Sequence, residues 1–111
     1  MKKGEIWFAH LDPTKGSEQA GYRPVVIISG NLLNAYSKVV WICPLTTQIK
    51  RYKGNVILSP TKENGLTKTS EVMNLLLRSI SKDRLHKKIG MMGGKHLETI
   101  RKGLYEILHL D

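Results

Sequence analysis

Hydrophobic residues gather in short runs along most of the chain. The runs 5–11, 25–28, 39–45 and 55–58 are rich in β-branched and aromatic residues, which suit a pleated, partly buried surface. Each of the four therefore predicts a strand. Residues 70–80 are also apolar and extended in character, and they predict one long strand or two short ones.

A helical period replaces these runs at the C-terminal end, after Gly93 and Gly94. Its apolar positions are Leu97, Ile100, Leu104, Ile107 and Leu108, which fall on one face of a helix. Residues 32–36 allow one short helical turn. The strands follow one another too closely for helical crossovers between parallel strands. The pattern predicts a mainly β protein, a small, strongly curved antiparallel sheet or barrel with a C-terminal helix.

Length and composition favour one folded domain over residues 1–111. Apolar residues make up 41% of the chain and charged residues 24%, the balance of a folded protein rather than a disordered one. No apolar run approaches the roughly 18–20 residues of a membrane helix. The start of the chain carries positive charge, but an acidic residue and polar breaks follow where a signal peptide would be apolar. We expect a soluble, cytoplasmic protein.

The charge indicates an anionic partner. Eighteen Lys and Arg residues oppose nine Asp and Glu residues, which gives a net charge of +9. Two stretches, 50–53 and 82–88, are densely basic. Nucleic acid is the commonest partner of so basic a protein, although two solvated loops would also explain the pattern.

Few residues suggest metal, cofactor or thiol chemistry. Cys43 is the only cysteine and lies in an apolar strand, so we expect a buried, unreactive thiol with a raised pKa. The four histidines are isolated in the sequence. No nucleotide-binding glycine loop, HExxH motif or pair of metal-binding carboxylates is present, and we expect neither a cofactor nor a metal.

The polar stretch that begins at Asp12 carries a family resemblance. Residues 12–28, DPTKGSEQAGYRPVVII, closely resemble the opening signature of the MazF/PemK toxins, the sequence-specific endoribonucleases (mRNA interferases) of bacterial toxin–antitoxin systems. Residues 44–48, PLTTQ, resemble the second motif of that family, and residues 78–85, RSISKDRL, resemble the third. Together these motifs extend the resemblance to essentially the whole chain.

The resemblance implies a fold, an activity and partners. The fold would be an SH3-like barrel with a C-terminal helix, assembled as a homodimer with an RNA groove near the subunit boundary. The activity would be metal-independent cleavage of single-stranded mRNA, leaving a 2′,3′-cyclic phosphate and a 5′-hydroxyl. The partners would be RNA and an acidic cognate antitoxin.

By family correspondence, Arg23 and Thr46 are the main catalytic pair. Residue chemistry agrees, because the arginine fork presents several donors to a phosphate and its charge does not titrate away. Arg23 is expected one residue before a strand, where Pro24 restricts the backbone. Thr46 is expected at the end of the strand over 39–45, where its hydroxyl can donate to a phosphate oxygen.

This chain departs from part of the family at Leu75 and Leu76, where some members carry an acidic residue followed by glutamine. An acid–base role for that carboxylate cannot be transferred. Glu18 is the remaining candidate for the base, although it could instead pin its loop through backbone amides. The residues expected to bind RNA are Lys15, Ser17, Gln19, Tyr22, Thr47 and Gln48. Among these, Tyr22 suits stacking on a base and Gln48 suits reading a base edge.

Two other functions remain open from the sequence. A related barrel can act by binding a protein target, as the gyrase-poisoning CcdB toxins do. A barrel of this kind can also bind RNA without cutting it. The presence of Arg23 and Thr46 within matched motifs favours the nuclease.

Overall fold

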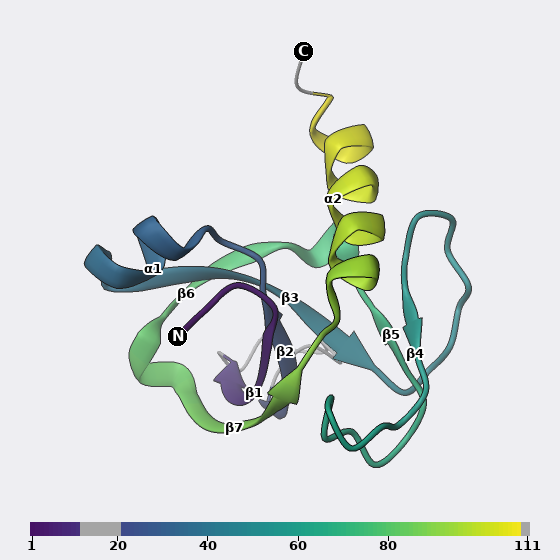
Figure 1. Ribbon diagram of the computed structural model, residues 1–111, viewed down its shortest axis with the longest axis horizontal. Coiled ribbons are helices and arrows are strands. Elements are labelled where there is room, and N and C mark those ends of the chain that lie inside the picture. The colour runs from purple at the N-terminus through teal and green to yellow at the C-terminus, as the bar shows by residue number, and fades with distance from the viewer. Residues whose placement is uncertain (12–20, 110–111) are drawn as a thin grey trace.

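The computed structural model describes residues 1–11 and 21–109. Within these residues the chain forms a curled antiparallel sheet with a long helix at its C-terminal end (Figure 1). The strands are β1 (Glu5–Leu11), β2 (Gly21–Ile27), β3 (Val39–Thr46), β4 (Ile57–Leu58), β5 (Ser70–Val72), β6 (Arg78–Ser81) and β7 (Leu85–Met91). The helices are α1 (Asn31–Tyr36) and α2 (Gly94–Leu108), with 3₁₀ turns η1 (Asn74–Leu76) and η2 (Lys82–Arg84).

Strand β3 is the centre of the sheet, whose order is β4-β5-β3-β2-β1-β7. One edge of β3 pairs with β2. The other edge changes partner along its length, since residues 39–42 pair with β6 and residues 45–46 pair with β5. Every pair is antiparallel. The predicted fold, a mainly β structure with a C-terminal helix, is confirmed.

The two middle strands are buried on both faces where they pair with each other, over residues 25–27 of β2 and 42–44 of β3. Neighbouring residues of β2 point to opposite sides, so Val26 joins one apolar cluster and Val25 joins the other. The first cluster includes Ile100 and Leu104 of α2, and the second includes Ile42 of β3. Burial on both faces explains why β2 carries an unbroken β-branched run instead of an alternating pattern.

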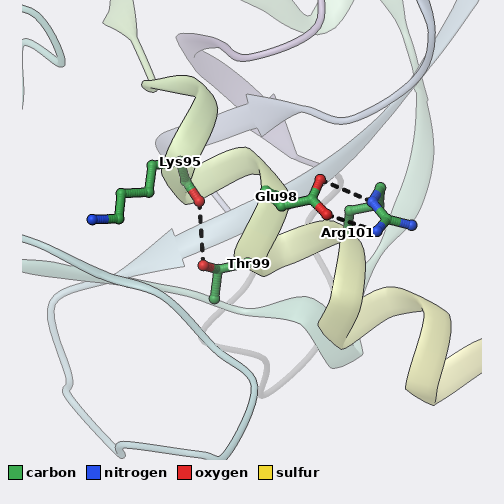
Figure 2. Close-up of polar contacts among 4 residues, drawn as sticks. All are labelled: Lys95, Glu98, Thr99 and Arg101. Carbon is green, nitrogen blue, oxygen red and sulfur yellow. Dashed lines mark hydrogen bonds and ion pairs between the residues drawn. The ribbon is translucent and has the colours of Figure 1, made fainter.

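Helix α2 is amphipathic, as its period predicts. Figure 2 shows its polar side, where Glu98 forms an ion pair with Arg101 at 2.6 Å and the Thr99 hydroxyl donates to the Lys95 carbonyl at 3.2 Å. Near its C-terminal end, Ile107 and Leu108 are 43% and 50% exposed. The apolar stripe is therefore longer than the part of the helix that the sheet buries.

Two strands differ from the sequence prediction for physical reasons. Strand β2 begins at Gly21, four residues earlier than predicted, and includes Pro24. Proline is tolerated there because residues 21–24 pair only with β1, while pairing with β3 begins at Val25. Strand β7 was not predicted. It is an edge strand that pairs with β1, and its exposed lysines hide the usual strand pattern.

The other predicted segments are close to the observed ones. Residues 70–80 form two short strands, β5 and β6, separated by η1. The strand predicted over 55–58 is shorter, with only Ile57 and Leu58 paired as β4. The short helical turn appears as α1. Asn64 and Gly65 form a tight turn, in which Gly65 has a φ of 68°.

Gly65 packs against β7, and this contact predicts a strong effect of substitution. A methyl group at Gly65 would lie 1.9 Å from the Ile89 carbonyl oxygen, and the positive φ adds strain for any side chain. We expect Gly65→Ala to lower the free energy of unfolding by roughly 1–3 kcal/mol. Gly94→Ala is the matched control, because it meets open space in the first turn of α2. Denaturant unfolding measures both, and equal stabilities would contradict this packing.

Candidate functional site

A hollow of about 340 Å³ opens where β2 and β3 stop pairing. Its lining consists of Arg23, Pro24, Leu45, Thr46, Thr47 and Gln48. The last pair of the β2–β3 ladder is Val25 with Pro44. Continuing that register by two residues sets Arg23 across from Thr46. The hollow thus brings together the ends of the first and second sequence motifs.

Arg23 lies within β2. The sequence had predicted a position just before the strand. Its backbone pairs with Ala9 of β1, and Pro24 follows it. The side chain is half-buried, and the buried Nε has no hydrogen-bond partner among the described residues. A buried donor without an acceptor typically costs about 1–3 kcal/mol. The Nε of Arg23 therefore keeps a hydrogen-bond donor that the described residues do not use.

Thr46 is the last residue of β3 and is buried. Its Oγ1 accepts a hydrogen bond from the Gln48 backbone N–H at 3.1 Å, which fixes the orientation of the hydroxyl group. Because this bond uses the oxygen as an acceptor, the hydroxyl proton remains to be donated to an oxygen atom in the hollow. A cation and a hydroxyl donor therefore line the same small space.

A buried carboxylate lies one strand away from Thr46. Glu71 of β5 pairs with Thr46 and is fully buried. Its hydrogen-bond donors are the backbone N–H groups of Lys50, Arg51 and Tyr52, at 2.6, 2.9 and 3.0 Å, and the Asn55 side-chain amide at 2.9 Å. Burial raises the pKa of the Glu71 carboxyl, but these donors together outweigh it and bring the pKa below its ordinary value.

The sequence interpretation missed Glu71. The signal was present as a single acidic residue between Ser70 and Val72, inside an otherwise apolar extended stretch. Such a carboxylate must find hydrogen-bond donors when it is buried. The donors come from a loop about twenty residues earlier in the chain, and only the folded structure identifies them.

Tyr22 lies beside the hollow but does not line it. Alternation along β2 directs its side chain to the face opposite Arg23. Its ring stacks on Phe8 with 4.8 Å between ring centroids, and its hydroxyl forms a 2.7 Å hydrogen bond with His86 Nδ1. The ring remains 46% exposed. The Tyr22 side chain is therefore partly exposed, on the side of β2 away from Arg23, and its ring contacts Phe8, His10 and His86.

Four of the predicted site residues lie outside the described residues. They are Lys15, Ser17, Glu18 and Gln19. Thr47 and Gln48 are exposed at the hollow, as expected for groups that could contact a ligand. Leu75, at the position where some relatives carry a carboxylate, is 67% exposed and lines a different hollow, between residues 52–55 and α2.

The single cysteine is buried, as the sequence predicted. Cys43 is fully buried, and burial raises its pKa to about 12, so the thiol is not a nucleophile near neutral pH. In residues 1–11 and 21–109, no group of three or more His, Cys, Asp or Glu side chains could hold a metal ion. No helix in this part of the chain combines the length and apolar character needed to cross a membrane.

Comparison with known proteins identifies the family. The family described as PemK-like, MazF-like toxin of type II toxin–antitoxin system matches residues 2–108. The chain belongs to this family. The endoribonuclease MazF9 of Mycobacterium tuberculosis is 36% identical over 117 residues, covering 100% of this chain and 97% of that protein. The endoribonuclease EndoA of Bacillus subtilis is 30% identical over 105 residues, covering 94% and 90%.

Solved structures share the fold of this PemK/MazF family member. MazF from Deinococcus radiodurans superimposes with a TM-score of 0.84 at 22% identity, covering 99% of this chain and 97% of that one. An endoribonuclease in complex with its cognate antitoxin, from a mycobacterial species, gives a TM-score of 0.81 at 22% identity, covering 100% and 97%. The curled sheet and C-terminal helix are thus those of known MazF proteins.

Proposed function

We propose that this PemK/MazF family member is a toxin that cleaves single-stranded mRNA at a short recognition sequence. The observation that carries the proposal is the hollow itself, which Arg23 and Thr46 line together. Relatives at 30–36% identity are named endoribonucleases, which supports the same function. The net charge of +9 suits a polyanionic substrate.

The proposed reaction is transesterification within the RNA strand. The ribose 2′-oxygen forms a bond to phosphorus while the bond from phosphorus to the 5′-oxygen breaks. The 2′-hydroxyl proton passes to a base, and the leaving 5′-oxygen gains a proton. The products are a 2′,3′-cyclic phosphate and a 5′-hydroxyl, and no metal ion takes part.

Arg23 and Thr46 stabilise the crowded phosphorane in this scheme. The guanidinium of Arg23 donates to the non-bridging oxygens as negative charge develops on them, and Thr46 donates to a second oxygen. Each preorganised donor of this type contributes on the order of 10²–10³ in rate. The backbone of Arg23 is fixed by strand pairing, and the hydroxyl of Thr46 is oriented by the Gln48 backbone N–H before the substrate arrives.

Substrate binding is assigned to the groups around the hollow. Thr47 and Gln48 line the hollow and contact the RNA next to the scissile phosphate. The exposed ring of Tyr22 stacks on a base beyond the hollow. Lys15, Ser17 and Gln19 complete the RNA-binding set, as the family motif implies.

The proposed partners follow from the family and the charge. Relatives have been solved with a cognate antitoxin or with MazE, and a positively charged toxin suits an acidic antitoxin that occludes its RNA site. We propose a homodimer in which residues 1–111 act as one toxin domain. The proposed location is the cytoplasm, where mRNA is translated.

Incubation of the purified protein with a long, defined transcript tests this function. We expect cleavage at a recurring short sequence, unchanged by EDTA, with 5′-hydroxyl ends that polynucleotide kinase labels without prior dephosphorylation. A toxin that acts like CcdB would leave the RNA uncut and unbound, and a binding barrel would retain it uncut. Loss of activity in EDTA, or 5′-phosphate ends, would contradict the proposed chemistry.

Glu18 is proposed as the base that accepts the 2′-hydroxyl proton. The change Glu18→Gln keeps the size and hydrogen bonding of the side chain but removes its basicity. A positioned base contributes roughly 10²–10⁴ in rate, so we expect single-turnover cleavage to slow by such a factor with RNA affinity unchanged. The melting temperature is the control. A near-normal rate, or a loss of rate that follows a loss of stability, would remove Glu18 from the reaction.

A further inference from the structure

The buried carboxylate of Glu71 is saturated by one loop. Its Oε1 accepts from the backbone N–H groups of Lys50 and Arg51. Its Oε2 accepts from the backbone N–H of Tyr52 and from the side-chain amide of Asn55. A carboxylate has about four lone-pair positions, so each is occupied. Three successive backbone N–H groups turned toward one point define the path of the loop.

Glu71 therefore sets a conformation that the loop would not adopt by itself. Arg51 has a φ of 59°, a left-handed conformation that is unfavourable by roughly 1–2 kcal/mol for a residue with a side chain. Burying a carboxylate is itself unfavourable unless its hydrogen bonds are complete. An apolar residue at this position of β5 would need neither the hydrogen-bond donors nor the left-handed conformation at Arg51. The consequence of having Glu71 there is the fixed shape of residues 47–55.

The far end of the loop is also fixed. The Asn74 side-chain amide donates to the Gly54 carbonyl at 3.0 Å, and its backbone N–H donates to Asn55 Oδ1 at 3.3 Å. Helix α2 closes over this point, since a methyl group at Gly103 would lie 2.5 Å from the Asn74 amide nitrogen. The loop is thus tied at Glu71 and again at Asn74.

The side chains of this rigid loop form a cationic surface. Lys50, Arg51, Tyr52 and Lys53 are all exposed, while their backbone groups point inward to Glu71. The loop leaves β3 directly after Thr46, and Thr46 pairs with Glu71. Three cations and one aromatic ring are therefore held a few residues from the hollow. Cations interleaved with an aromatic ring are typical of a surface for single-stranded nucleic acid.

We propose that Glu71 is a positioning residue for RNA binding, which holds loop 47–55 so that Lys50, Arg51 and Lys53 contact the phosphates flanking the scissile one. The inference rests on the proposed function. Glu71 touches neither the substrate nor the reacting atoms, and it acts through the loop. A change at Glu71 alters the affinity for RNA, whereas changes at Arg23 and Thr46 alter the rate of the chemical step.

Glu71→Gln in the full chain tests this role. The change replaces one acceptor oxygen by an NH₂ group that faces N–H donors, so the loop is released. We expect the Kd for a short RNA with a 2′-deoxy scissile nucleotide to rise about tenfold, with KM rising in parallel and kcat within about threefold. Glu63→Gln is the matched control, because it removes one exposed negative charge away from the loop and should leave Kd unchanged.

A second variant decides the matter if Glu71→Gln fails to fold. Lys50→Gln with Lys53→Gln leaves the Glu71 hydrogen bonds intact. It should weaken binding and reduce the slope of log affinity against log salt by about 1.4, since each phosphate contact on a single strand contributes about 0.7. Unchanged Kd in this variant, or in a folded Glu71→Gln protein, would overturn the inference. A fall in kcat at unchanged KM would also overturn it.

The wild-type protein separates this inference from the proposed function. If wild type cleaves RNA and the loop variants bind normally, the role of Glu71 is wrong and the nuclease assignment stands. If wild type neither binds nor cleaves RNA, the proposed function itself fails.

Discussion

The antiparallel register between β2 and β3 is the constraint on which the site depends. The paired parts of both strands are buried on both faces, so a slip of one residue would exchange their side chains between the two apolar clusters. The register that satisfies the core, with Val25 opposite Pro44, is the same register that sets Arg23 opposite Thr46. The packing of the apolar core is therefore sufficient to place Arg23 and Thr46, the two catalytic candidates, across from each other.

In the proposed function, the chemical step and the binding of substrate use different parts of the structure. Arg23 within β2 and Thr46 at the end of β3 line an open hollow, one as a half-buried cation and the other as an oriented hydroxyl. The cations of loop 47–55 are not among the residues that line the hollow, and a carboxylate on the next strand holds the backbone of their loop. A rigid site of this kind does not need to reorganise when charge develops on a phosphate, which is the main source of electrostatic catalysis.

Much of this could be predicted from the sequence. The β-branched runs and the period of α2 predict most of the elements, and the motifs identify Arg23 and Thr46. Strand β7 could not be predicted, because its exposed lysines hide the strand pattern. Pro24 argued against a strand at this point, so the early start of β2 was not predicted. Proline is accepted there because residues 21–24 pair only with β1. Glu71 was missed because its partners are distant in sequence.

The central claim is that Arg23 and Thr46 act together on one phosphate, and a double-mutant cycle tests it most directly. Single-turnover cleavage of a short RNA would be measured for wild type, Arg23→Ala, Thr46→Ala and the double variant, each with its melting temperature. The account predicts a loss on the order of 10²–10³ for Arg23→Ala, a smaller loss for Thr46→Ala, and a double variant little slower than Arg23→Ala. A wild-type rate in folded Arg23→Ala, or losses that simply multiply, would contradict it.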